Sequence, residues 1–192
     1  MSPVTHFFIG WAVANSTEFD RRERAMVTVA GIAPDVDGLG IFAELLTRNS
    51  ETPLRWWSEY HHVLGHNLGF CLVCVALGAG IARQRWKTAL LVALSFHLHL
   101  FCDVIGARGP DGDQWPIPYL LPFSDAWSVA WEHQWALNAW PNLLITTLGI
   151  GMALYWAWSR GTTPLEIVSA KADNAVVEAL RNRVPRRQGS GR

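Results

Sequence analysis

The stretch TALLVALSFHLHLFCDVI, residues 88–105, decides the fold: this apolar run carries His97 and His99 and reaches Asp103 near its end. Its length approaches the ~20 residues that a membrane-spanning helix needs. Residues four apart share a helix face, so His99 and Asp103 can bind one ion while His97 points elsewhere. An ionised aspartate in an apolar run is costly unless it is paired, coordinated or faces water at the helix end, and a metal accounts for Asp103 economically.

Similar apolar segments lie on both sides of this run, and none shows the alternation of apolar and polar residues that is typical of a strand. We therefore predict an all-α fold. The segments expected to be helical are 3–14, 25–34, 39–47, 67–82 and 141–158. The longer ones approach the length of a span, and the shorter ones suit half-spans or helices packed inside a bundle. We therefore expect a multi-helix membrane-embedded bundle; the alternative is a soluble protein with very apolar core helices.

The C-terminal part differs in character, which divides the chain into a membrane domain, 1–160, and a C-terminal segment, 161–192. The pattern from Thr163 to Glu166 is that of a capping box with proline at the first helical position. Apolar residues then recur at helical spacing and predict an amphipathic helix over 164–183. The basic tail PRRQGSGR, 185–192, is expected to be disordered.

Composition and charge both favour a lipid bilayer as the partner. Only 17% of residues are charged, against ~25% in soluble domains, and zero net charge gives no indication of a nucleic-acid partner. If the apolar runs alternate in direction, 13 of the 16 basic residues fall on one side. The positive-inside rule then predicts a multi-pass protein with its basic loops and C-terminal tail in the cytoplasm.

The same alternation gathers the candidate metal ligands at the opposite end of the bundle, where helical bundles build such sites. PDVD at 34–37 is expected to form a turn, and HHVLGH at 61–66 to open a helix; in the latter, His62 or His61 pairs with His66, depending on where the helix begins. Asp37 alone is more typical of a helix cap. Imidazole with carboxylate suits zinc, and also manganese or iron. The candidates are His6, Asp35, Asp37, His61, His66, His99 and Asp103.

The order of these motifs resembles that of the bacterial inner-membrane family of predicted metal-dependent hydrolases, over roughly residues 1–125. That family carries HRGxTHS where this chain has HHVLGHN, and SHxxxD before a turn and a WP where this chain has His99 to Asp103 and then Trp115-Pro116. It is in turn distantly similar to zinc-dependent phospholipase C and the single-strand-specific zinc nucleases, which are all-α phosphoesterases. His62 replaces the family's arginine, so a phosphate-steering role does not transfer.

The resemblance implies an inner-membrane hydrolase that cleaves a small-molecule or lipid phosphoester with water activated by one or two divalent ions, expected to be zinc. It implies His6, Asp35 or Asp37, His61, His99 and Asp103 as ligands, with His66 as a further ligand or a supporting group. Asp103 or a PDVD aspartate would bridge two ions, and Asp35 or His66 would act as general base. His62, His97 and His133 are not expected to be direct ligands.

Two other functions compete with the hydrolase. The same cluster could serve a transport or metal-handling protein, in which case ligands should follow a water-filled path. A non-catalytic membrane scaffold, binding a cytoplasmic partner through its basic tail, predicts ligands that do not converge. Trp127, Trp131 and Trp135 are also expected to share one helical stripe and to anchor the chain at the membrane interface.

Overall fold

The computed structural model describes residues 1–109 and 112–184. Within this part of the chain the secondary structure is helical, with no strand beyond two isolated bridges, so the all-α prediction is confirmed. The tail expected at 185–192 lies outside the described residues. The elements are α1 (Pro3–Ala14), α2 (Arg21–Ala30), the 3-10 helix η1 (Ala33–Leu39), α3 (Gly40–Thr47), α4 (Trp56–Tyr60), α5 (Leu68–Ile81), α6 (Arg85–Gly106), α7 (Trp140–Arg160), the 3-10 helix η2 (Pro164–Ile167) and α8 (Ala170–Arg183).

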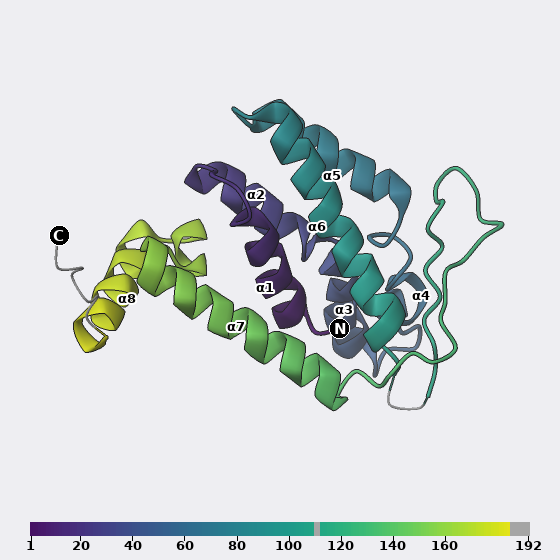
Figure 1. Cartoon of the computed structure of the whole chain (residues 1–192). Helices are drawn as coiled ribbons and strands as arrows, with labels where there is room; N and C mark the ends of the chain where they lie inside the picture. The colour runs from purple at the N-terminus through teal and green to yellow at the C-terminus, as the bar shows by residue number, and fades with distance from the viewer. Residues whose placement is uncertain (110–111, 185–192) are drawn as a thin grey trace, which may run out of the picture.

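Helix α6 forms the centre of the molecule. It pairs with α5 on one side and packs against α1 and α2 on the other, while α7 crosses α1 and leads to α8 at the far end (Figure 1). The PDVD segment, expected as a turn, lies in η1 directly after α2. The buried cores between these helices comprise Val13, Ala14, Phe19, Val27, Ala30 and Val92, and next to them Cys71, Phe96, Leu100 and Ile117.

A close approach of α1, α2 and α6 sets the position of the first histidines. A Cβ atom on Gly10 would lie 2.7 Å from the carbonyl oxygen of Thr28 and 3.1 Å from Ser95 Oγ, so only glycine fits at this crossing. One turn along each helix from the crossing, His6 of α1 and His99 of α6 stack with ring centroids 3.8 Å apart. The crossing thus brings together two imidazoles that are far apart in the sequence.

The predicted helix over 164–183 is confirmed only in its later part, which is α8, and the predicted capping box is wrong. Glu166 does not return to the backbone of Thr163; it accepts bidentate hydrogen bonds from Arg24 of α2, at 2.5 and 2.8 Å. The N–H of Thr163 donates instead to Asp173 at 2.6 Å. The segment breaks after η2, and Ser169 caps α8 through the N–H of Ala172. Tertiary ion pairing therefore overrides the local capping pattern.

The predicted tryptophan stripe is also wrong, because Trp127, Trp131 and Trp135 lie in a segment without helix between α6 and α7. The chain there runs as an extended loop that is held by isolated bridges, Ile117 to Val129 and Arg108 to Ala136. Two glycines and four prolines between residues 107 and 122 disfavour a helix in the first half of this segment. The indoles pack locally, Trp131 on Trp135 and Trp127 on Tyr119.

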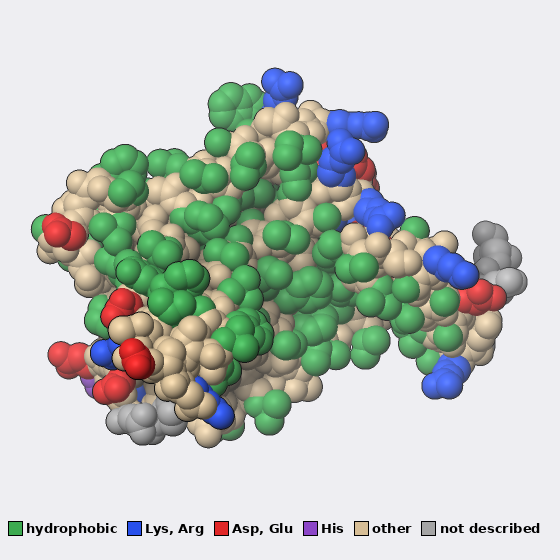
Figure 2. All heavy atoms as spheres, turned by 180° about the vertical axis from the view of Figure 1, so that it is seen from behind, with side chains coloured by type: hydrophobic (Ala, Val, Ile, Leu, Met, Phe, Trp, Pro, Cys, Tyr) green, Lys and Arg blue, Asp and Glu red, His purple; other side chains and the backbone are tan. Residues whose placement is uncertain are grey.

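Among the described residues, α6 is the one helix long and apolar enough to cross a membrane. Helix α2 and residues 33–47, bent by 55° at their break, could together form a second span, whereas α1 and α5 are shorter apolar helices. Exposed leucines such as Leu90 of α6 and Leu143 of α7, each 69% exposed, give the outer surface an apolar character that suits lipid contact. Figure 2 shows this surface as a wide hydrophobic area between charged ends. The multi-pass topology and its orientation stay predictions.

Candidate metal centre

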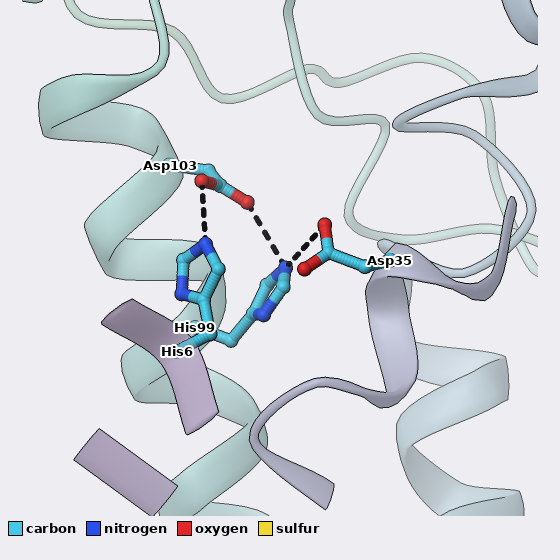
Figure 3. A group of neighbouring side chains, drawn as sticks. All are labelled: His6, Asp35, His99 and Asp103. Carbon is cyan, nitrogen blue, oxygen red and sulfur yellow. Dashed lines mark hydrogen bonds and ion pairs between the residues drawn. The ribbon is translucent and has the colours of Figure 1, made fainter. Parts of the chain in front are cut away.

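Four side chains from three elements meet at the C-terminal half of α6. His99 and Asp103 lie one turn apart on α6, His6 comes from α1, and Asp35 comes from η1 (Figure 3). His6 Nε2 lies 3.1 Å from Asp103 Oδ1, which the amino group of Met1 also contacts. His99 Nε2 lies 3.0 Å from Asp103 Oδ2 and 3.8 Å from Asp35 Oδ1. These residues form a first group that could hold a cation.

A second group shares Asp103 and adds His62 and His66 from the loop before α5. His66 Nε2 lies 3.4 Å from Asp103 Oδ2 and 3.1 Å from His99 Nε2. All three members of this group are buried, as are His6 and His99 of the first. One carboxylate shared by two groups of possible ligands has the placement of a group that bridges two metal ions.

Hydrogen bonds at Nδ1 of His66 and His99 orient both rings so that Nε2 points into the metal centre. His99 Nδ1 lies 2.8 Å from the carbonyl oxygen of Gly31, which can only accept, so Nδ1 donates. His66 Nδ1 likewise donates to Asp37 Oδ2 at 3.1 Å. In their neutral forms, the two rings would aim their Nε2 lone pairs at each other and at Asp103 Oδ2, a buried oxygen with no hydrogen bond. Three converging acceptors fit a divalent cation, and the Nδ1 bonds match the usual support of metal-binding histidines.

The pKa values of the loop histidines reflect the same acceptor-rich centre. Burial disfavours the charged form of His66, but the carboxylates of Asp103 and Asp37 beside its ring outweigh burial and raise the pKa to about 9. His62 behaves in the opposite way: burial, reinforced by the neighbouring His66, lowers its pKa to about 3. His62 is thus neutral at physiological pH, and its buried Nδ1 has no hydrogen-bond partner. The centre attracts positive charge and presents a neutral imidazole beside it.

Asp37 and His61 belong to neither group and lie behind His66. Asp37 accepts hydrogen bonds from His61 Nδ1 at 2.9 Å, from His66 Nδ1 and from the backbone N–H of Gly65 at 2.8 Å. The carboxylate thereby ties the HHVLGH loop to η1 and fixes the ring of His66. Of the two PDVD aspartates, the structure brings Asp35 toward the ligands and gives Asp37 this supporting position.

The loop conformation explains which histidines approach the centre. Helix α5 begins at Leu68, after the motif, so HHVLGH does not open a helix as expected. His62 adopts a positive φ of 66°, which turns its ring onto His66 at a centroid distance of 4.3 Å. Sequence reasoning therefore missed His62, and no signal in the motif indicates a left-handed histidine. His97 lies apart, bonded to Ala93 and Tyr119, and His133 is exposed beside Trp131.

Replacing Gly65 with alanine should disrupt the loop, because the added Cβ would collide with the backbone carbonyl of Pro34 in η1. We expect a loss of about 1–3 kcal/mol in the free energy of unfolding and weaker metal binding. Gly80→Ala on α5 is the matched control, since nothing lies near the new methyl group and alanine favours a helix by about 0.5–1 kcal/mol. Thermal unfolding of both variants checks this; equal stabilities would refute the close contact.

A cavity of about 580 Å³ opens beside the second group. Its wall includes His61, His62 and the indoles of Trp57 and Trp115, which lie 5.3 Å apart between ring centroids. Trp115 also contacts the ring of His62, with 4.9 Å between centroids. Because His62 belongs both to the cavity wall and to the second group, an ion held there would be reachable by a small molecule in the cavity.

A comparison with models of protein families identifies the family of this chain. A family model described as YdjM inner membrane protein matches residues 1–176. The chain belongs to the YdjM family. The YdjM match covers both ligand groups and agrees with the predicted membrane location, and its description specifies no reaction. No curated protein and no solved structure matches the chain, so these comparisons lend no support to a similarity with zinc phospholipase C or the zinc nucleases.

Proposed function

We propose that this YdjM-family protein is a membrane-bound, metal-dependent hydrolase of phosphoesters. The observation that carries the proposal is the convergence of His66 Nε2, His99 Nε2 and Asp103 Oδ2, at 3.0–3.4 Å from one another. With both rings neutral, these three acceptors have no donor among them, and a divalent cation that displaces the proton of His66 would satisfy all three. Imidazole and carboxylate ligands favour zinc, with manganese and iron as the other candidates.

The two ligand groups that share Asp103 support a phosphoester as the substrate. Two ions held by one carboxylate would lower the pKa of bound water and stabilise the attacking and leaving oxygens of an in-line displacement at phosphorus. In this assignment His6, Asp35 and His99 would hold one ion and His62 and His66 the other, and Asp103 is common to both groups. His61 and Asp37 orient His66.

Asp35 is the better candidate for the residue that receives the proton of the attacking water. Its side chain is 18% exposed, unlike the fully buried His66. Asp35 Oδ1 faces His99 and would hold the ion, whereas Oδ2 has no hydrogen-bond partner and is left to take the proton. His66 uses Nδ1 to hold Asp37 and directs Nε2 at the other ligands, which suits a ligand rather than a base. Water is then the nucleophile, and no covalent intermediate with the protein forms.

Two features favour hydrolysis over the competing functions. The ligands gather in one compact cluster beside a cavity, rather than along a path through the helices as ion transport requires. A scaffold gives no reason for the ligands to converge. The indoles of Trp57 and Trp115 provide apolar cavity walls next to the ligands, as small-molecule sites usually do.

The full chain, purified in detergent micelles, tests the proposal. After chelation and reloading with Zn²⁺ or Mn²⁺, we expect it to hydrolyse bis(p-nitrophenyl) phosphate, and the chelated protein to be inactive. The carboxylic ester p-nitrophenyl acetate serves as the non-phosphorus comparison, and His133→Ala, which alters an exposed histidine outside the cluster, should keep the full rate. A loaded protein that binds metal but cleaves no phosphoester would instead favour metal handling.

A further inference from the structure

A second cavity, of about 550 Å³, lies at the opposite end of α2 and α6 from the metal centre. Its wall is formed where α2 begins, where α5 connects to α6, and by η2. Three arginines, Arg21, Arg22 and Arg83, line it together with Ala25 and Ile167. Arg85 starts α6 here, and at 1.5 Å per residue His99 is about 20 Å further along the helix. The arginine cavity, as we call it, is thus separate from the hydrolase site.

The acidic groups of the arginine cavity are already engaged in the fold. Asp20 accepts a hydrogen bond from the N–H of Glu23 at 2.9 Å and caps α2. Glu23 is buried and accepts the N–H of Gln84 at 2.7 Å, which fastens the α5–α6 connection. Among the described residues no ion pair joins Arg21, Arg22 or Arg83 to a carboxylate, and all three are exposed. Their guanidinium groups are therefore free for an external anion.

The surroundings of the arginine cavity are those of a membrane surface. Trp86, which is 89% exposed, stands between the exposed cations Arg85 and Lys87. Leu90 is exposed one turn further along α6, and Val168 is exposed directly after Ile167 of the cavity wall. Tryptophan flanked by cations at the end of an apolar helix is typical of the interface between lipid and water. Figure 2 shows Lys and Arg side chains gathered at the upper right, directly beside hydrophobic side chains.

We propose that the arginine cavity binds the phosphate of an anionic phospholipid headgroup. Guanidinium groups match phosphate oxygens with paired hydrogen bonds, and basic pockets between membrane helices favour anionic headgroups. Exposed apolar side chains of α5 and α6 near their connection, Leu77, Ile81 and Leu90, would give the acyl chains a place to lie, which a free phosphate does not need. The site would anchor this end of the protein at the membrane surface, independently of the reaction at the other end.

Binding of defined lipids to the purified full chain tests the proposal. The probes are phosphatidylglycerol, phosphatidylcholine and glycerol phosphate, and native mass spectrometry from detergent counts the bound lipid. We expect about tenfold tighter binding of phosphatidylglycerol than of phosphatidylcholine, and a loss of most of this preference in Arg21→Gln/Arg83→Gln. Arg48→Gln/Arg55→Gln removes the same charge from exposed arginines outside the arginine cavity and should keep the preference.

Three results would overturn the proposal. Equal binding of the two lipids would show no selection for an anionic headgroup. Equal losses in both double variants would show only general charge attraction. Glycerol phosphate that competes fully with phosphatidylglycerol would show a site for soluble phosphates instead of lipid. Because the altered arginines are exposed and unpaired, the double variant should unfold at the wild-type temperature; if it does not, Arg83→Gln alone should lose about threefold in lipid affinity.

Discussion

Replacing Asp103 with asparagine is expected to lower the rate of phosphoester hydrolysis by about 10³-fold or more, because a bound metal contributes several kcal/mol to transition-state stabilisation. Asp103 belongs to both groups of possible ligands, so one change would weaken both of the proposed ion sites. Asparagine keeps the shape of the side chain but loses the negative charge that faces His6, His66 and His99. No other single substitution should cost the reaction more.

The rate measurement needs two accompanying observations. Circular dichroism should report wild-type helix content for Asp103→Asn, because the carbonyl of residue 103 still accepts the bond from Gln134. Metal analysis of the same sample should find less bound ion. A folded Asp103→Asn protein that cleaves bis(p-nitrophenyl) phosphate at the wild-type rate would rule out Asp103 as a ligand for the reaction.

Replacing Asp37 with alanine is expected to weaken metal binding by about 10- to 100-fold, although Asp37 is not itself in a ligand group. The carboxylate holds His66, His61 and the N–H of Gly65, so its removal frees the HHVLGH loop. Asp37→Asn keeps one acceptor oxygen and should lie between wild type and alanine. Affinity is measured by competition with a chelating dye.

Control variants distinguish a role of Asp37 in orienting His66 from a role in the stability of the fold. Gly65→Ala disturbs the same loop from its other side, whereas His133→Ala changes an exposed histidine beside Trp131. If Asp37→Ala lowers the unfolding temperature of the metal-free protein but leaves metal affinity unchanged, Asp37 supports the fold alone and not the orientation of His66.

The parts of the fold that depend on local pattern were predictable from the sequence. The apolar runs at 67–82, 88–105 and 141–158 correspond to α5, α6 and α7. The pairing of His99 with Asp103 follows from helix geometry alone, since residues four apart share a face. The crossing at Gly10 that adds His6 could not be derived, because it depends on how three helices pack.

The parts that depend on tertiary partners were not predictable. The choice among His61, His62 and His66 is made by the loop, where Asp37 binds two of the rings and His62 takes a left-handed conformation. In the C-terminal segment, Glu166 prefers Arg24 to the local cap. The hydrogen bonds of Asp37 and Glu166 join residues far apart in the chain, so the spacing of residues in a motif cannot predict them.

The metal content of the purified protein tests the central claim most directly. Elemental analysis of the full chain should find about one to two equivalents of a divalent metal in the wild type and in His133→Ala. His99→Ala and Asp103→Ala should each retain less than about a tenth of it. Near-zero metal in all four proteins, after growth and purification with the metal supplied, would contradict the account, as would undiminished metal in the two ligand variants.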